Sequence, residues 1–91
     1  MTNTTATTTV RPLYIIANEI INDWHVTAKN GIYFGAKPYL DAMRSLDNIS
    51  DNYGMDSGKS IVLYFLSNAS TWRGETAKRV KAELNAMLKS K

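Results

Sequence analysis

The sequence predicts an all-α protein, a compact single-domain bundle of about four helices, from three observations. Apolar residues recur at helical spacing over residues 13–28, 38–46 and 71–88, and this periodicity is the main sequence signal for helices. A fourth apolar segment, residues 56–69, begins with residues that can cap a helix. The connections between these segments are short and rich in turn-forming residues, as in antiparallel bundles.

The segment over residues 56–69, DSGKSIVLYFLSNA, contains the longest unbroken apolar run of the chain at residues 61–66. Periodicity alone does not separate a buried helix from a buried strand in so short a run. We favour a helix because Asp56 or Ser57 can cap it, and because residues 67–70 lack a hairpin turn signal. On a helix the six apolar side chains point almost all the way round. The pattern therefore predicts a nearly inaccessible helix wrapped by the others, with Leu63 and Phe65 both buried.

Residues 1–10 differ in composition from the rest of the chain, with six threonines and no charged residue. We expect a flexible tail there and a single helical domain over residues 11–91. The first helix is expected to begin at Pro12, which suits the first turn of a helix. Ile15 and Val26 are apolar residues on its polar side. The predicted core face of this helix comprises Leu13, Ile16, Ala17, Ile20, Ile21, Trp24 and Ala28.

The remaining elements follow from the same periodicity. Residues 29–31 end the first helix, residues 32–35 form an aromatic connection, and a second helix covers residues 38–46. Residues 47–55 are expected to form a loop, and Ser70 or Thr71 to cap a last helix ending near residue 88. The predicted core residues of these two helices are Tyr39, Leu40, Met43 and Leu46 in the second, and Ala77, Val80, Leu84, Met87 and Leu88 in the last.

Composition limits the classes of function that we expect for this chain. The chain has 91 residues, 44% hydrophobic and 21% charged, with no cysteine and a formal net charge of +3. The basic excess lies in residues 71–91, which hold six Lys or Arg against two Glu. Apolar stretches are too short for a membrane span, and the N-terminus lacks the pattern of a signal peptide. We therefore expect a soluble, cytoplasmic protein without disulfides or contact with a membrane.

Catalytic and metal-binding motifs find little support. Gly58-Lys59-Ser60 resembles the end of a phosphate-binding loop, but the first glycine of that motif would fall on Tyr53. Residues 47–58 fit neither register of a calcium-binding EF-hand loop. His25 is the only histidine, and no cysteine accompanies it. The sequence predicts a protein that is not an enzyme and has no cofactor, no metal site and no catalytic residues.

Trp72, Arg73 and Glu75 form the predicted contact surface for a protein partner. On a last helix that starts near residue 71, Trp72 lies about 140° from Ala77, away from the core stripe, at 100° per residue. Tryptophan and arginine often dominate interface energies, and Gly74 lets a partner backbone approach closely. In the competing interpretation, Trp72 folds back against Tyr64 or Trp24 and closes the core.

Nucleic-acid binding is the alternative function. Residues 59–88 follow the outline of a helix-turn-helix, with a short helix, a turn at 68–70 and a basic last helix. Its candidate phosphate contacts are Arg73, Lys78, Arg79 and Lys81. However, Glu75 precedes Arg79 by four residues and Arg79 precedes Glu83 by four, a spacing typical of local ion pairs on a solvated helix face.

Three stretches carry a resemblance to known proteins: YFGAKPYLDAM at 33–43, DNYG at 51–54 followed by SIV at 60–62, and YFLSNASTWRGETAKR at 64–79. Together they resemble small uncharacterised proteins of tailed bacteriophages infecting actinobacteria, over roughly residues 33–88. The resemblance implies an accessory protein in the cytoplasm of an infected bacterium that binds a host or phage protein. The sequence leaves the partner's identity open, and also whether the chain forms a homo-oligomer or sequesters an anionic ligand.

Overall fold

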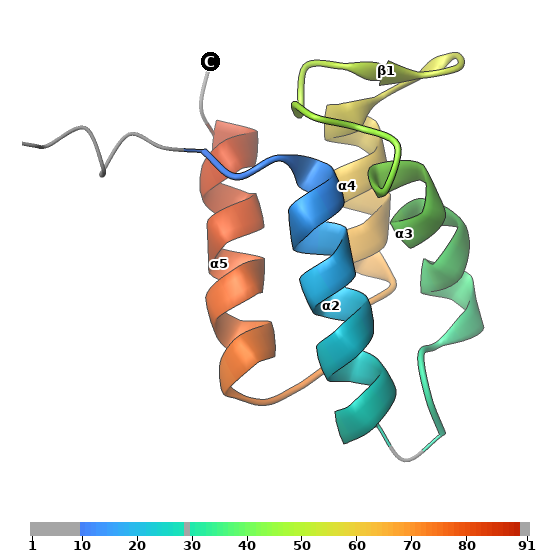
Figure 1. Ribbon diagram of the computed structural model, residues 1–91, viewed down its shortest axis with the longest axis vertical. Helices are drawn as coiled ribbons and strands as arrows, with labels where there is room; N and C mark the ends of the chain where they lie inside the picture. The colour runs from blue at the N-terminus through green and yellow to red at the C-terminus, as the bar shows by residue number, and fades with distance from the viewer. Residues whose placement is uncertain (1–9, 29, 90–91) are drawn as a thin grey trace, which may run out of the picture.

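The computed structural model describes residues 10–28 and 30–89, and within these ranges the fold is an all-α bundle. Four α-helices alternate in direction along the chain (Figure 1). Their bounds are Leu13–Thr27 (α2), Lys37–Met43 (α3), Gly58–Ser67 (α4) and Glu75–Lys89 (α5). A short 3-10 turn, η1 (Phe34–Ala36), precedes α3. The predicted all-α class is confirmed. The predicted tail, apart from Val10, lies outside the described residues.

The first turn of α2 is tied to the end of α3. Pro12 lacks an N–H group, and no side chain caps α2. Instead the N–H groups of Leu13 and Tyr14 donate to the carbonyls of Asp47 and Leu46, both at 2.9 Å. These bonds satisfy two of the donors that a helix start leaves without intrahelical partners. The backbone hydrogen bonds at the start of α2 therefore depend on the position of the chain just after α3.

A small hairpin that the sequence did not indicate joins the loop predicted over residues 47–55 to the start of the next segment. Strands β1 (Asn52–Tyr53) and β2 (Asp56–Ser57) pair antiparallel, with Tyr53 opposite Asp56. Before them, the Asp51 carboxylate accepts from the N–H groups of Asp47 and Asn48 at 3.2 and 3.0 Å. The Asp51 carboxylate therefore stabilises a turn at the start of this loop.

Residues 61–66 are helical, so the preference for a helix over a strand is confirmed. Ser57 caps α4 as expected, its hydroxyl accepting from the N–H of Ser60 at 3.1 Å. Gly58 lies against the preceding loop, where a Cβ atom would come within 2.6 Å of the Ile49 carbonyl oxygen. That crowding explains why glycine suits the first residue of this helix.

The predicted burial of the whole apolar run is wrong. Leu63 and Tyr64 are 53% and 52% exposed, whereas Phe65 is fully buried. The physical reason is that α3 and α5 pack against α4, leaving one side of it without a covering element. Six consecutive apolar residues cannot all share one helix face, so the run leaves two large side chains in solvent.

The core lies between the facing sides of all four helices and contains most of the predicted residues. Ile21, Ala28, Tyr39 and Leu88 are only partly buried at its margin. Ile15 and Val26 are exposed on α2, as their place on its polar side predicts. The buried members with the largest side chains are Trp24, Trp72, Phe65, Leu13, Ile16, Ile20, Leu40, Met43 and Leu84.

Two helix boundaries differ from the sequence prediction. Helix α3 ends at Met43, after which Ser45 and Leu46 donate to carbonyls three residues back and tighten the chain into a turn. Helix α5 begins at Glu75, about four residues later than expected. Gly74 has φ +113°, a backbone conformation that residues with a side chain rarely adopt and that is not helical. The connection of seven residues at 68–74 therefore ends at Gly74, and the helix begins after it.

Candidate functional site

The residues predicted to form a site lie in two different environments. Trp72, Arg73 and Glu75 lie in the connection at 68–74 and at the start of α5, whereas Lys78, Arg79 and Lys81 lie further along α5. The first three residues are the predicted protein contacts, and Arg73 together with the other three are the predicted phosphate contacts.

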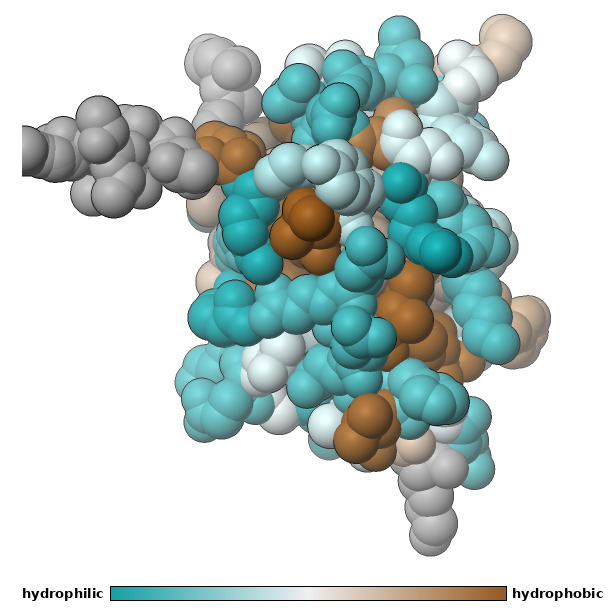
Figure 2. Space-filling model, viewed as in Figure 1, coloured by the Kyte–Doolittle hydropathy of each residue, from teal (hydrophilic) through white to brown (hydrophobic). Residues whose placement is uncertain are grey.

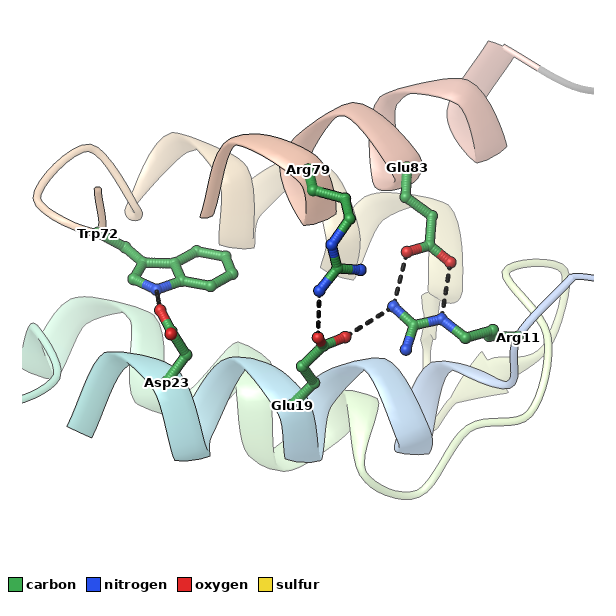
Figure 3. Close-up of polar contacts among 6 residues, drawn as sticks. All are labelled: Arg11, Glu19, Asp23, Trp72, Arg79 and Glu83. Carbon is green, nitrogen blue, oxygen red and sulfur yellow. Dashed lines mark hydrogen bonds and ion pairs between the residues drawn. The ribbon is translucent and has the colours of Figure 1, made fainter. Parts of the chain in front are cut away.

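Trp72 is a core residue, and the prediction that it lies on the last helix, away from the core, is wrong. Its side chain is fully buried and stacks on Trp24 with ring centroids 5.9 Å apart and planes 19° apart. Phe65 packs against it edge-on at 6.4 Å. The indole N–H donates to the Asp23 carboxylate at 2.8 Å (Figure 3). A side chain held in this way closes the core and offers no contact surface to a partner.

Lys81 is occupied in holding the same connection. Its ammonium group donates to the carbonyls of Ala69 and Trp72 at 2.8 and 2.7 Å and lies 5.9 Å from the Trp72 ring centroid. Burial lowers the pKa of Lys81, and the nearby positive charge of Arg73 lowers it further. Two of the three donors of the ammonium group thus bond to loop carbonyls, so most of its hydrogen-bonding capacity is used within the chain.

A network of ion pairs joins α2 to α5 and involves Arg79 (Figure 3). Arg11 donates to both carboxylate oxygens of Glu83, at 3.0 and 2.6 Å, and lies 2.8 Å from Glu19. Arg79 pairs with the other oxygen of Glu19. The hydrogen bonds to Glu83 raise the pKa of Arg11 above its usual range, and the Arg79 hydrogen bond lowers the pKa of Glu19, with Arg11 lowering it further.

The local ion pairs expected within the last helix are therefore replaced by pairs between helices. Among the described residues, Arg79 pairs with neither Glu75 nor Glu83. The reason is geometric: α2 packs beside α5 and brings Arg11 and Glu19 within reach of the face where Arg79 and Glu83 lie. Hydrophilic side chains cover most of this side of the molecule (Figure 2).

This network predicts a specific pH dependence of stability. A carboxylate whose pKa is depressed in the folded state stabilises the fold above its unfolded pKa of about 4.3, and this contribution is lost as the pH falls through the folded value. Replacing Glu19 by Gln should cost about 1 kcal/mol at pH 7, and the difference from the wild type should shrink below about pH 4. Urea unfolding at several pH values measures it. Asp47→Asn, at an exposed carboxylate outside the helices, is the control and should change the free energy of unfolding by no more than about 0.5 kcal/mol at pH 7.

An open groove lies at one end of the bundle, with a volume of about 670 Å³. It lies where the connection between α2 and η1 and the connection between α4 and α5 both turn (Figure 1). We call it the end groove. Its lining residues are Thr27, Ala28, Asn30, Gly31, Ile32, Tyr33, Phe34, Thr71 and Arg73.

Aromatic residues form one wall of the end groove. Phe34 is 74% exposed, and its ring centroid lies 5.0 Å from that of Tyr33, which is itself partly exposed. A Cβ atom at Gly35 would lie 2.5 Å from the Tyr33 ring and 3.0 Å from the Asn68 carboxamide. Glycine at position 35 thus lets the Tyr33 ring pack between η1 and the connection after α4.

Arg73 is the predicted site residue that lines this groove. It is exposed and follows directly after the buried Trp72. The buried indole of Trp72 therefore fixes the position of the backbone from which the Arg73 side chain extends. Glu75 and Lys78 are exposed nearby in the chain but do not line the groove. The structure therefore separates the two predicted sets: Arg73 lies at a groove, Trp72 is in the core, and Arg79 and Lys81 have intramolecular partners.

Sequence reasoning missed the aromatic wall because it assigned residues 32–35 only as a connection. A signal was present, since Ile32, Tyr33 and Phe34 form an apolar run without a helical face to bury them.

Within the described ranges, no group of three or more His, Cys, Asp or Glu is placed to hold a metal ion. The same part of the chain contains no helix with the length and apolarity needed to cross a membrane. Comparisons with protein-family models, curated proteins and solved structures find no match to the chain.

Proposed function

We propose that this chain is a small non-catalytic accessory protein that binds another protein through the end groove. The observation that carries the proposal is the exposure of Phe34, 74% in solvent, on the wall of a groove that Arg73 also lines. Burying a large aromatic side chain contributes about 1.5 to 3 kcal/mol. The monomer lacks this contribution at Phe34, and a partner that covered the ring would gain it. Aromatic residues and arginine are the types most enriched at protein interfaces.

The proposed partner is a phage or host protein, met in the bacterial cytoplasm. The resemblance of residues 33–88 to phage proteins supports this setting, and two of the stretches that carry it include groove residues: Tyr33 and Phe34 in the first, Thr71 and Arg73 in the last. Among the described residues, the groove combines an apolar wall with the Arg73 guanidinium and several hydroxyl or amide groups. It suits a partner segment that presents an apolar side chain next to a carboxylate.

Nucleic-acid binding is less well supported by the geometry. Of the four candidate phosphate contacts, Arg79 pairs with Glu19 and Lys81 holds two backbone carbonyls. Helices α4 and α5 run in opposite directions (Figure 1), whereas the two helices of a helix-turn-helix cross at about 90° to 120°. Only Arg73 and Lys78 remain exposed without such contacts.

Parallel pull-downs with groove variants test the proposal. The tagged chain and its Phe34→Ala and Arg73→Ala variants are expressed in bacteria, and the captured proteins are compared after nuclease treatment. We expect a protein that the wild type retains and that both groove variants capture at least tenfold less, because each variant removes an anchor worth about 2 kcal/mol or more. Met55→Ala is the matched control, since Met55 is 99% exposed on the hairpin and does not line the groove.

Two outcomes would contradict the proposal. Equal capture of the same protein by the wild type and both groove variants would place the contact elsewhere. Loss of all specific capture on nuclease treatment, with steep dependence on salt before it, would instead favour the nucleic-acid alternative.

A further inference from the structure

The outer face of α4 carries an apolar surface that no element of the described chain covers. Its members are Ser60, Leu63, Tyr64 and Ser67, which we call the α4 face. Leu63 and Tyr64, 53% and 52% exposed, stand at its centre, and the two serines lie one turn before and one turn after them. The face lies on a regular helix, so its side chains have fixed spacing along one axis.

The order of these residues is symmetric about the midpoint between positions 63 and 64. If a second α4 lies antiparallel against the first with a two-fold axis at that midpoint, Leu63 of each copy faces Tyr64 of the other. Ser60 then faces Ser67, so small residues meet small residues on both sides of the apolar centre. A two-fold interface requires a surface that is complementary to itself, and the α4 face meets this requirement in sequence order.

Charge is compatible with the same arrangement. Lys59 is the only charged residue of α4, and in the antiparallel pairing it faces Asn68 of the other copy. The two Lys59 residues lie about 13 Å apart along the helix axes, at 1.5 Å per residue, which is beyond the Debye length of about 8 Å at physiological salt. An antiparallel pair also places opposite ends of the helix dipoles side by side.

A cleft beside Tyr64 extends the apolar area of the α4 face. It has a volume of about 240 Å³ and is lined by residues of α3, α4 and the hairpin, including Tyr39, Tyr53 and Tyr64. The rings of Tyr39 and Tyr64 lie 5.6 Å apart, centroid to centroid. Leu63 of a second copy, facing Tyr64, would arrive at the mouth of this cleft and find aromatic carbon there.

We propose that a second copy of this chain occupies the α4 face, forming a two-fold dimer with antiparallel α4 helices. Helix α4 has ten residues and is about 15 Å long, so with the neighbouring cleft the interface is small, below about 600 Å² per copy. That is about a tenth of the 5919 Å² surface of the chain. Interfaces this small are typical of weak, transient complexes, so we expect a reversible dimer with a dissociation constant on the order of 1 to 100 μM.

Sedimentation equilibrium over about 5 μM to 1 mM, a range chosen to bracket that constant, tests the dimer. The wild type should pass from monomer to dimer, and Leu63→Lys should stay monomeric throughout, because each copy would place a lysine beside the two-fold axis. Ile15→Lys is the matched control, at a residue 41% exposed on α2, and should dimerise like the wild type. A wild type that is monomeric over the whole range, or a Leu63→Lys variant that still dimerises, overturns the proposal.

Disulfide trapping tests the arrangement without relying on the lysine variant. The chain has no cysteine, so Leu63→Cys introduces a single thiol near the axis and should oxidise to a covalent dimer. Ser60→Cys should not, because the two positions 60 lie about 10 Å apart along the axes, beyond the roughly 7 Å Cα separation that a disulfide allows. Trapping at both positions, or at neither, overturns the antiparallel register.

The dimer and the proposed partner site use different residues, so their failures are distinguishable. The α4 face contains no residue of the end groove. A monomer that still captures a protein through Phe34 overturns the dimer alone. A dimer whose groove variants capture the same proteins as the wild type overturns the partner site alone.

Discussion

Replacing Trp72 by Ala should lower the free energy of unfolding by about 3 to 5 kcal/mol, a large part of the total for a small domain. The side chain is fully buried, stacks on Trp24 and satisfies the Asp23 carboxylate at 2.8 Å. Its removal leaves a cavity between α2 and α4 that the helices can close only in part, and it leaves Asp23 without its donor. Urea unfolding monitored by circular dichroism measures the loss.

The neighbouring residue provides the control for this prediction. Arg73→Ala changes an exposed side chain in the same connection and should alter the free energy of unfolding by no more than about 0.5 kcal/mol. If Trp72→Ala were as stable as the wild type while losing a binding partner, the indole would be a contact residue and its packing against Trp24 would not be maintained in solution.

Phe65→Ala should also destabilise the fold by about 3 to 5 kcal/mol, whereas Leu63→Ala, two residues away on the same helix, should cost less than about 1 kcal/mol. Phe65 is fully buried and Leu63 is 53% exposed. Phe65 also packs edge-on against Trp24, with centroids 6.3 Å apart. Both variants remove large apolar side chains, so their difference isolates the effect of burial.

The urea midpoints of these two variants decide whether α4 is covered on one side only. Equal, large losses would mean that Leu63 is enclosed, as the unbroken apolar run by itself suggests. Because the proposed dimer would bury Leu63, the comparison is made at about 1 μM protein, at or below the lower bound expected for its dissociation constant.

Much of the fold could be predicted from the sequence because α2 and α5 each carry one apolar stripe at helical spacing. Such a stripe fixes both the helix and its buried face, as Ile16, Ile20 and Val80 show. The α4 segment lacks a stripe, so its capping residues predicted the helix but no pattern predicted which side of it is buried. Which of Leu63 and Phe65 faces inward depends on where α3 and α5 pack, and no local pattern encodes that.

The candidate site was harder to predict because it depends on where connections turn. Ser70 and Thr71 are good capping residues, so the sequence predicts that Trp72 lies on the last helix. In the structure Gly74 has a positive φ and α5 begins only after it, so Trp72 lies in the connection and its indole is buried in the core. A glycine followed by an acidic first-turn residue, Glu75, was the available signal for the later start. The joining of Phe34 and Arg73 in one groove brings together residues 39 positions apart, a long-range contact that spacing cannot reveal.

Site-specific photocrosslinking at position 34 tests the proposed protein-binding role of the end groove most directly. A photoreactive phenylalanine analogue replaces Phe34 in one variant and Met55 in another, and irradiated bacterial cells are examined for covalent adducts of the tagged chain. The proposal predicts a discrete adduct with a second protein from position 34 and none from position 55, and its loss when Arg73→Ala is added. Equal labelling from both positions, or no adduct from position 34 in cells where the chain captures a partner, would contradict it.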